Sequence, residues 1–386
     1  MKQRWIGLAL SVALLAACEG GGGSAESPSV PPGGPAEAHD PTPTPTPVEL
    51  GIFADVRGWI AYGNDEGIWA VNPTPGSSPS DRIQLSERGP AVPVAWSSDG
   101  SKLLINRGDP SYLGPTLLGP GELVVLNSDG TETLLVRGGR YDSFSGGSFT
   151  PDGSKVVCSI LTWPPNEEWQ SGIYDVDADG GSPRLLLAAG QRNYAGGAFQ
   201  TAVFSPTFSP DGTHIAYVDG MGDWGNTPWV MNADGSGVRE LIDQEVGHFD
   251  NLAWSADGSR LAFNGLYGEG ILIVGVDGSG LTTADGKDVQ WSPTGSRLAF
   301  QAGSWSGRWV GEGIWVMNAD GSGQRQVVPL GRKPVWSPDG SRITYLGHGG
   351  LLYVADLDGT HVRTLGDLSQ PRPTSVAWNP LPPSAS

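Results

Sequence analysis

The stretch Trp336-Ser-Pro-Asp-Gly-Ser-Arg-Ile-Thr-Tyr345 joins an aromatic residue, a turn sequence and a short apolar strand. Proline presets the φ angle of the first central turn position, aspartate caps its own backbone, and glycine suits the position that needs a positive φ. The aromatic residue before the turn, and the apolar residues Ile343 and Tyr345 after it, are typical of strands with one buried face. The stretch therefore predicts a β-hairpin.

This hairpin pattern recurs along the chain from about residue 50. The copies of the aromatic residue and its first turn are Trp96–Gly100, Phe149–Gly153, Phe208–Gly212, Trp254–Gly258, Trp291–Gly295, Trp336–Gly340 and the degenerate Trp378-Asn-Pro380. A second turn, Asn/Asp-x-Asp-Gly, follows the third strand of a repeat, most clearly at Trp229–Gly235 and Trp315–Gly321. Successive first-turn glycines are 37 to 59 residues apart, which is the size of a four-stranded propeller blade.

The first strand of the repeat occurs seven times, and its last copy, Ser375–Trp378, is followed by no further strand of that repeat. The first repeat has a second, third and fourth strand at 59–62, 68–71 and 82–85, but no recognisable first strand. The two fragments complete one blade if the chain ends meet, and closure also removes open sheet edges. The sequence therefore predicts an all-β, seven-bladed β-propeller of four-stranded blades over residues 49–380, closed by pairing the C-terminal strand with the first blade, with a tail at 381–386.

The aromatic-Ser-Pro-Asp-Gly and Asn-x-Asp-Gly motifs resemble the repeats of TolB-type and WD40-like (PD40) propellers over roughly residues 50 to 380. The resemblance implies a propeller fold. TolB has an additional α/β domain before its propeller, whereas this chain has a Gly- and Pro-rich segment there. The resemblance therefore implies none of TolB's own partners.

Residues 1–18 have the pattern of a bacterial lipoprotein signal peptide. Lys2 and Arg4 precede the apolar run Ile6–Leu15, which is too short to span a bilayer. The following Leu15-Ala-Ala-Cys18 resembles a lipobox, in which the cysteine is lipidated after cleavage. The alternative is ordinary Ala-x-Ala cleavage that leaves Cys18 free.

Residues 19–48 begin with a run of glycines and end with alternating proline and threonine. Such a segment builds no core, so it predicts a disordered tether between the lipid anchor and the propeller. We therefore expect an extracytoplasmic protein of the bacterial cell envelope, anchored through Cys18 to the cell membrane or the outer membrane and touching the membrane in no other way.

The composition agrees with many short strands and tight turns, because the chain contains 59 glycines, 32 prolines and 15 tryptophans. The formal net charge is −18. So acidic a surface repels phosphate backbones, and we expect no nucleic acid partner.

No enzyme motif stands out in the sequence. It contains no Gly-x-Ser-x-Gly, no His-Glu-x-x-His, and only five scattered histidines. Asp175-Val-Asp-Ala-Asp-Gly180 resembles a calcium loop, but Leu186 stands where such a loop needs glutamate, and the segment aligns with the second turns of the other repeats. We expect a turn there, and no catalytic residue, metal or cofactor.

The aspartates of the first turns recur in nearly every repeat, which indicates turn formers instead of catalytic carboxylates. Cys158 aligns with the core residues of the second strands, so we expect a buried thiol without reactivity. The aligned residues are Tyr62, Ile105, Tyr217, Phe263, Phe300 and Tyr345.

Strand direction alternates, so the first and second turns share one rim, which carries only short Asp-Gly turns. The opposite rim, here the long-loop face, carries the long connections 106–121, 159–172, 219–227 and 302–312 between second and third strands, and 137–147 and 188–203 between blades. Long loops on a rigid scaffold are where binding sites usually lie. The candidate ligand residues on this face are Tyr112, Arg140, Tyr141, Trp163, Trp169, Arg192, Tyr194, Trp224, Trp305 and Trp309.

Aromatic and arginine side chains on loops suit a binding surface for a protein, a peptide or a glycan. The alternative is that these aromatics fold back, plugging the central channel or forming small cores of their own. We expect a monomeric, non-catalytic binding or scaffold module whose partner is an envelope protein, a peptide or a glycan. The alternatives are a polysaccharide lyase or hydrolase acting at the channel mouth, and a purely structural assembly hub.

Overall fold

In the computed structural model, the six first turns that end at Gly100, Gly153, Gly212, Gly258, Gly295 and Gly340 are tight hairpins stabilised by their own side chains. In the turn of Phe208–Gly212, the amide of Gly212 donates to the carbonyl of Ser209 (2.8 Å), and the amide of Thr213 donates to Oδ1 of Asp211 (3.0 Å). Gly212 has a φ of 71°, where a residue with a Cβ atom is strained. The predicted roles of aspartate, which caps the turn, and of glycine, which takes the positive φ, are confirmed.

The chain divides into two units, Met1–Pro47 and Val48–Ser386. The structure describes residues 51–74, 81–108, 116–118, 121–138, 142–162, 170–194, 197–220, 226–242, 252–264, 270–302, 304–305, 309–310, 313–347, 351–365 and 376–381. A short 3-10 helix, η1 (Gly51–Val56), precedes the strands.

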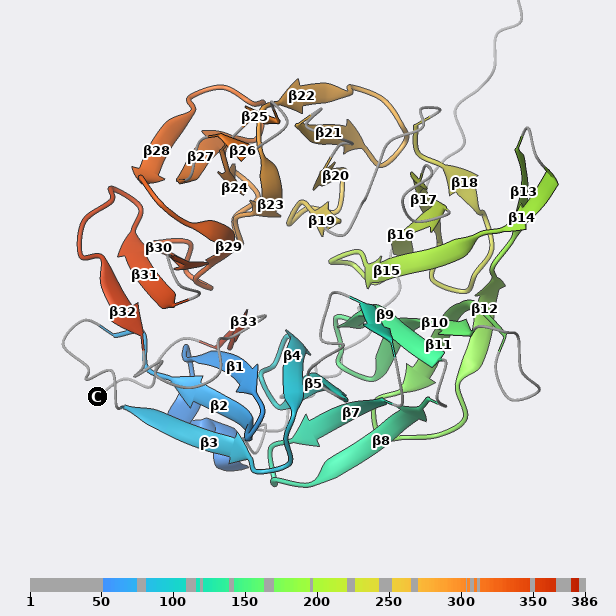
Figure 1. The fold of residues 1–386 in the computed structure, drawn as a ribbon, viewed down its shortest axis with the longest axis horizontal. Coiled ribbons are helices and arrows are strands. Elements are labelled where there is room, and N and C mark those ends of the chain that lie inside the picture. The colour runs from blue at the N-terminus through green and yellow to red at the C-terminus, as the bar shows by residue number, and fades with distance from the viewer. Residues whose placement is uncertain are drawn as a thin grey trace, which may run out of the picture. The chain divides into compact units, whose positions relative to one another are not determined.

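Seven antiparallel sheets form a ring in the second unit (Figure 1), which confirms the predicted seven-bladed propeller. Given from the innermost strand outwards, blade 1 is β33 (Val376–Trp378), β1 (Ile60–Asn64), β2 (Gly67–Val71) and β3 (Arg82–Ser86). Blade 2 is β4 (Ala91–Trp96), β5 (Lys102–Arg107), β7 (Glu122–Asn127) and β8 (Glu132–Arg137). Blade 3 is β6 (Thr116–Leu118), β9 (Asp142–Phe149), β10 (Lys155–Thr162), β11 (Gly172–Asp177) and β12 (Arg184–Ala188).

The other four blades each have four strands. Blade 4 is β15 (Ala202–Phe208), β16 (His214–Gly220), β17 (Asn226–Asn232) and β18 (Arg239–Glu240), and blade 5 is β19 (Ala253–Trp254), β20 (Arg260–Asn264), β21 (Ile271–Gly275) and β22 (Thr282–Ala284). Blade 6 is β23 (Lys287–Trp291), β24 (Arg297–Gln301), β27 (Ile314–Asn318) and β28 (Arg325–Val328), and blade 7 is β29 (Arg332–Trp336), β30 (Arg342–Leu346), β31 (Leu352–Asp356) and β32 (Arg363–Leu365). Two separate hairpins are β13 (Gln191–Tyr194) with β14 (Gly197–Gln200), and β25 (Ser304–Trp305) with β26 (Trp309–Val310).

The ring closes as predicted, because β33 from the C-terminal end pairs with β1 from the first repeat. Ile60 pairs with Trp378 and Tyr62 with Val376. The indole Nε1 of Trp378 also donates to the carbonyl of Gly58 (2.7 Å). Blade 1 is therefore assembled from both ends of the propeller sequence.

The hydrophobic core lies between neighbouring blades. Phe208 and Tyr217 of blade 4, for example, pack in one cluster with Val157 and Ile173 of blade 3. Cys158 is fully buried and packs with Leu104 and Leu123 of blade 2. The aromatic residue of each repeat thus joins two blades, and the predicted burial of Cys158 is confirmed.

Successive first turns also contact one another around the ring. A Cβ atom added to Gly212 would lie 2.8 Å from Cδ of Pro151, in the turn of the preceding blade. The same neighbours recur at Gly258 with Pro210, and at Gly340 with Pro293. The proline and glycine of the motif therefore meet across blade boundaries.

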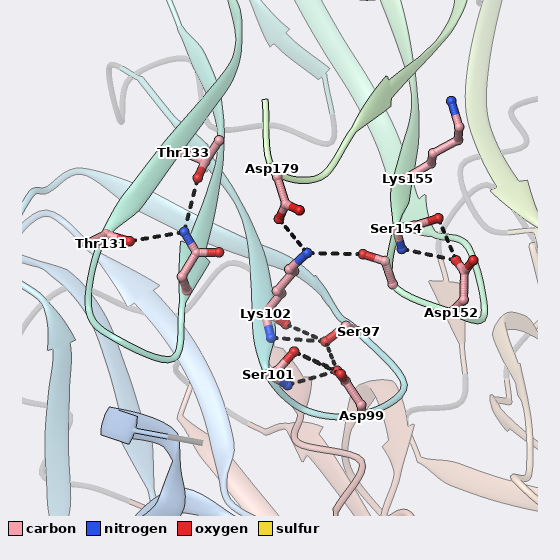
Figure 2. A network of polar contacts seen from close by, with 12 residues as sticks. Ser97, Asp99, Ser101, Lys102, Thr131, Thr133, Asp152, Ser154, Lys155 and Asp179 are labelled. Carbon is pink, nitrogen blue, oxygen red and sulfur yellow. Dashed lines mark hydrogen bonds and ion pairs between the residues drawn. The ribbon is translucent and has the colours of Figure 1, made fainter. Parts of the chain in front are cut away.

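Arginines tie each of several blades to the second turn of the next. Nη1 of Arg260 donates to the carbonyl of Ala319 (3.2 Å), and Nη1 of Arg325 donates to that of Leu357 (2.6 Å). Arg239 of blade 4 contacts the carbonyl of Val276 in the same way. Figure 2 shows a lysine in this role, with Nζ of Lys102 2.7 Å from Oδ1 of Asp179 in blade 3.

The structure differs from the sequence-based prediction at both rims. Strand residues 142–147, 159–162, 202–203 and 219–220 lie in segments predicted as loops. The Gly- and Ser-rich sequence of β9 does not predict a strand. The strand is defined by backbone pairing with β10 on one side and with β6 on the other. The second turn of blade 1 is longer than the short Asp-Gly turn predicted, since Asn72 donates to the carbonyl of Asp81 across it.

Candidate functional site

The strands that exceed the four-per-blade pattern all arise from the long-loop face. β6 comes from the connection 106–121, the hairpin β13–β14 from 188–203 and the hairpin β25–β26 from 302–312. The first turns that the structure describes, by contrast, differ from one another mainly in their side chains. The elaboration of the repeat is therefore concentrated at one end of the blades.

One of these connections reaches the inner edge of the neighbouring blade. β6 pairs with β9, the innermost strand of the blade 3 repeat, through Thr116 with Ser145 and Leu118 with Ser143. The connection that follows the second strand of blade 2 therefore extends the sheet of blade 3 towards the centre of the ring. Part of the long-loop face thus packs on the propeller itself.

The structure describes only some of the predicted ligand residues. Arg192 and Tyr194 lie on β13, and Trp305 and Trp309 are backbone partners in the hairpin β25–β26. The hairpin β13–β14 lies at the outer edge of the ring in Figure 1, whereas β25–β26 lies between β24 and β27 of blade 6 in the sequence. Outside the described residues lie Tyr112, Arg140, Tyr141, Trp163, Trp169 and Trp224.

The innermost strands carry a recurrent bulge that the sequence analysis missed. Ser205, Asp288 and Lys333 each have a φ of 50° to 53°, and each stands three residues before the aromatic residue of its first turn. The register of each strand pair shifts there. A non-glycine residue at positive φ is uncommon, and bulges redirect side chains. A proline directly after Ser205 and Lys333 was the available sequence signal.

Buried amide side chains lie near the long-loop end of the second strands. Asn264 and Gln301, each directly after the core phenylalanine of its strand, are both 7% exposed. Their side-chain oxygens, and that of Asn106, accept no hydrogen bond from the described residues. Buried polar atoms without a protein partner are usually paired with ordered water or a ligand. These amides are functional candidates that the sequence analysis did not name.

Charged side chains join blades 1 and 2 where the second strand of blade 2 ends. Arg107, 6% exposed, contacts Glu132, and Arg88 pairs with the same carboxylate (2.7 Å). Glu122 pairs with Arg137 (2.8 Å) at the margin of this cluster. Burial lowers the pKa of Arg107, and Glu132 opposes that effect. The arrangement is a partly buried ion-pair network that fixes two blades against each other.

The first-turn aspartates and Cys158 have pKa values that do not suit proton transfer at neutral pH. Hydrogen bonds from Thr150 and Ser154 lower the pKa of Asp152 to about 2, and the same arrangement lowers the pKa of Asp211 to about 2. Burial raises the pKa of the Cys158 thiol to about 12. A general acid or nucleophile works best with a pKa near the ambient pH.

Neither a metal centre nor a membrane span is found in the part of the chain that the structure describes. Its His, Cys, Asp and Glu side chains form no group of three or more placed to hold a metal ion. Its helical structure provides no segment with the length and apolar character needed to cross a membrane.

A pocket of about 480 Å³ opens on the turn rim between blades 5 and 6. It lies where both blades depart from the motif, with Ala256 in place of proline and Thr294 in place of aspartate. The lining residues include Asp257, Arg260 and Trp291.

No protein-family model matches the chain, and no curated protein matches it either. Among solved structures, TolB from Acinetobacter baumannii is 17% identical, with a TM-score of 0.50 over 72% of this chain and 66% of that one. An oligogalacturonate lyase in complex with manganese is 16% identical, with a TM-score of 0.52 over 80% of this chain and 84% of the lyase. A Bacteroides fragilis protein provisionally named a 6-phosphogluconolactonase is 13% identical, with a TM-score of 0.56 over 84% and 98% of the two chains.

The chain thus spans just under two thirds of the TolB chain that it resembles, and its neighbours include proteins named as enzymes. At these identities the likeness establishes the fold and no activity. This chain is a seven-bladed, TolB-like β-propeller.

Proposed function

We propose that this protein is a non-catalytic lipoprotein of the cell envelope whose propeller binds a protein, a peptide or a glycan through the long-loop face. One observation carries the proposal: β6, β13–β14 and β25–β26 all arise from connections of that face. A rigid ring with additional strands and long loops at one end is a typical scaffold for recognition. The core and the opposite rim supply the rigidity.

The location of the protein rests on its N-terminal sequence. The basic residues, the short apolar run and Cys18 form a lipobox-like signal, and the tether 19–48 provides the distance between membrane and propeller. Expression of the full gene in a bacterial host, with mass analysis of the N-terminal peptide, tests this directly. A diacylated Cys18 is expected, and Cys18→Ser is expected to release the protein from the membrane fraction. An unmodified Cys18 would contradict the anchor.

Binding is tested by pull-down from envelope extracts and on a glycan array with the wild type and single variants. Trp163→Ala, Trp169→Ala, Trp224→Ala, Trp305→Ala and Trp309→Ala are each expected to weaken capture of the same ligand at least tenfold. Leu281→Ala is a suitable control because Leu281 is 40% exposed and follows a second turn on the opposite rim. Unchanged capture by all five tryptophan variants would exclude this face.

Thermal unfolding separates binding from the alternative that the tryptophans form small cores of the loops. Substitution of a tryptophan that contacts the ligand is expected to weaken capture and leave Tm unchanged. Substitution of a tryptophan that fills a loop core is expected to lower Tm.

The alternative function is a polysaccharide lyase or hydrolase acting at the channel mouth. The protein is therefore incubated with oligogalacturonate and other polysaccharides, with and without manganese. We expect no new reducing ends and no unsaturated products. Turnover of any of these substrates would replace the binding proposal.

A further inference from the structure

The pocket of about 480 Å³ between blades 5 and 6 has the size of a small-molecule site. Blade 5 contributes Asp257 and Arg260 to its lining, and blade 6 contributes Trp291, Ala319 and Asp320. The pocket opens on the turn rim, opposite the long-loop face. It is therefore a candidate site that is separate from the function proposed above.

The charged residues of this pocket occupy positions that form an ion pair at another blade boundary. Between blades 2 and 3, Nζ of Lys102 is 2.7 Å from Oδ1 of Asp179 (Figure 2). Arg260 and Asp320 stand at the same two positions of the repeat between blades 5 and 6, but no described carboxylate forms an ion pair with Arg260. Its Nη1 donates instead to the carbonyl of Ala319 (3.2 Å). Since a guanidinium has five N–H groups, donors remain for a ligand.

Both carboxylates of the pocket are exposed. Hydrogen bonds from Ser255 and Ser259 to Oδ1 (2.6 to 3.0 Å) lower the pKa of Asp257 to about 2. Hydrogen bonding by Ser322, whose amide is 2.9 Å from Oδ1, lowers the pKa of Asp320 as well. No described group donates to Oδ2 of Asp257, so this oxygen can accept from a ligand. At neutral pH the lining thus combines two carboxylates with one guanidinium.

Trp291 in the pocket wall lacks a contact that its equivalents make with the preceding blade. Nε1 of Trp254 donates to the carbonyl of Thr207 (3.2 Å), and Nε1 of Trp336 donates to that of Gln290 (3.1 Å). Nε1 of Trp291 is buried and has no acceptor among the described residues. Buried polar atoms without a protein partner are usually paired with water or a ligand. The boundary between blades 5 and 6 therefore keeps unused donors as well as unused acceptors.

We propose that this pocket binds a neutral saccharide through Asp257, Arg260 and Asp320. A sugar hydroxyl both donates and accepts hydrogen bonds, so neighbouring hydroxyls can pair with a carboxylate and with a guanidinium in one pocket. A simple anion faces two carboxylates here, and a simple cation faces a guanidinium, so neither matches the lining. Trp291 and Ala319 add apolar surface for the C–H groups of the sugar ring.

A saccharide in this position also joins two blades, because Arg260 belongs to blade 5 and Asp320 to blade 6. A ligand that binds only the folded ring stabilises it by mass action. We therefore expect Tm to rise as the pocket is saturated.

A glycan array probed with the full chain tests the class of ligand. We expect capture of at least one neutral glycan, and saturable binding of the same saccharide in calorimetric titration. Raising the ionic strength with sodium chloride is expected to leave this affinity unchanged, because a neutral ligand is not screened by salt. Methylammonium and acetate, titrated in parallel as a simple cation and a simple anion, are expected to show no saturable binding.

Asp320→Asn is expected to weaken saccharide binding at least tenfold. It is expected to leave the Tm of the free protein unchanged, because asparagine accepts the same turn hydrogen bond from Ser322. Asp277→Asn is the matched control. Asp277 stands at the same position in the second turn of blade 5, accepts from the amide of Ser279 (3.0 Å) and lines no part of the pocket. This variant is expected to bind the saccharide as tightly as the wild type.

Arg260→Gln and Arg325→Gln form a second matched pair. Arg325 donates to the carbonyl of Leu357 (2.6 Å) in the next blade, as Arg260 does to that of Ala319, but it does not line the pocket. Both variants are expected to lower Tm. Only Arg260→Gln is expected to weaken saccharide binding, at least fivefold.

Trp305→Ala separates this site from the long-loop face, since it is expected to leave saccharide binding in the pocket unchanged. The proposal is overturned if the array captures no neutral glycan, or if the affinity falls as the ionic strength rises. Equal saccharide affinity of Asp320→Asn and Asp277→Asn, or saturable binding of methylammonium or acetate that Asp320→Asn abolishes, would also overturn it.

Discussion

Gly212 of blade 4 stands so close to Pro151 of blade 3 that a Cβ atom on the glycine would lie 2.8 Å from the proline Cδ. Gly212 also has a φ of 71°. The same glycine therefore satisfies a local requirement of its own turn and a packing requirement between two blades. Since a proline ring cannot rotate out of the way, the second requirement is as strict as the first.

Gly212→Ala and Gly280→Ala separate these two requirements. Gly280 has a φ of 65°, but no atom lies within 4 Å of a Cβ placed there. We expect Gly280→Ala to lower the free energy of unfolding by about 1 kcal/mol through backbone strain, and Gly212→Ala by about 3 kcal/mol because overpacking is added. Urea denaturation measures both. Equal losses would show that the contact with Pro151 carries no energy.

Tryptophans at the equivalent position of neighbouring blades differ in one hydrogen bond. Nε1 of Trp336 donates to the carbonyl of Gln290 (3.1 Å), whereas the buried Nε1 of Trp291 has no acceptor among the described residues. We expect Trp336→Phe to cost about 1 kcal/mol more than Trp291→Phe, because only the former breaks a hydrogen bond. Chemical denaturation of the two variants gives the comparison, and a larger loss for Trp291→Phe would contradict it.

The first-turn aspartates predict how stability depends on pH in acid. Hydrogen bonds lower the pKa of Asp152, Asp211 and Asp257 to about 2, below the value of about 3.9 for an unfolded chain. Their contribution to stability is therefore complete above about pH 4 and is lost as the pH falls towards 2. The triple variant with asparagine at these positions is expected to have a Tm that falls less steeply than the wild type between pH 5 and pH 2.

A charge change outside the first turns, compared with the single variant Asp211→Asn, tests whether this effect belongs to the turns. Asp285→Asn removes a carboxylate from an exposed connection between blades 5 and 6. We expect the acid dependence of Tm in this variant to match that of the wild type. An equally shallow slope in both variants would mean that overall charge, and not turn hydrogen bonding, governs acid unfolding.

Cys158 is expected to react with maleimide only after unfolding. The side chain is fully buried, and burial raises the pKa of its thiol to about 12, so neither access nor thiolate is available in the native protein. Peptide mass analysis distinguishes Cys158 from Cys18. Cys158→Ser is expected to cost about 1 to 3 kcal/mol because it buries an unpaired hydroxyl, more than Cys158→Ala. Rapid labelling of native Cys158 would contradict the buried position.

Several parts of the molecule were predictable because they depend on neighbouring residues in sequence. The turns follow from the φ preferences of proline and glycine and from aspartate capping, and the number of blades follows from counting them. The candidate ligand residues were placed by loop length alone, and loop length does not fix where a loop lies.

The sequence by itself determined the hairpins, their order and the closure of the ring, because each depends on local backbone preference or on the alternation of buried side chains. Only the tertiary structure decided that Gly212 meets Pro151, that β6 joins the sheet of blade 3, and that Arg342 reaches Pro73 across the ring closure. Contacts of this kind join residues far apart in the chain. They depend on how seven twisted sheets fit around one axis, which no local pattern of residues specifies.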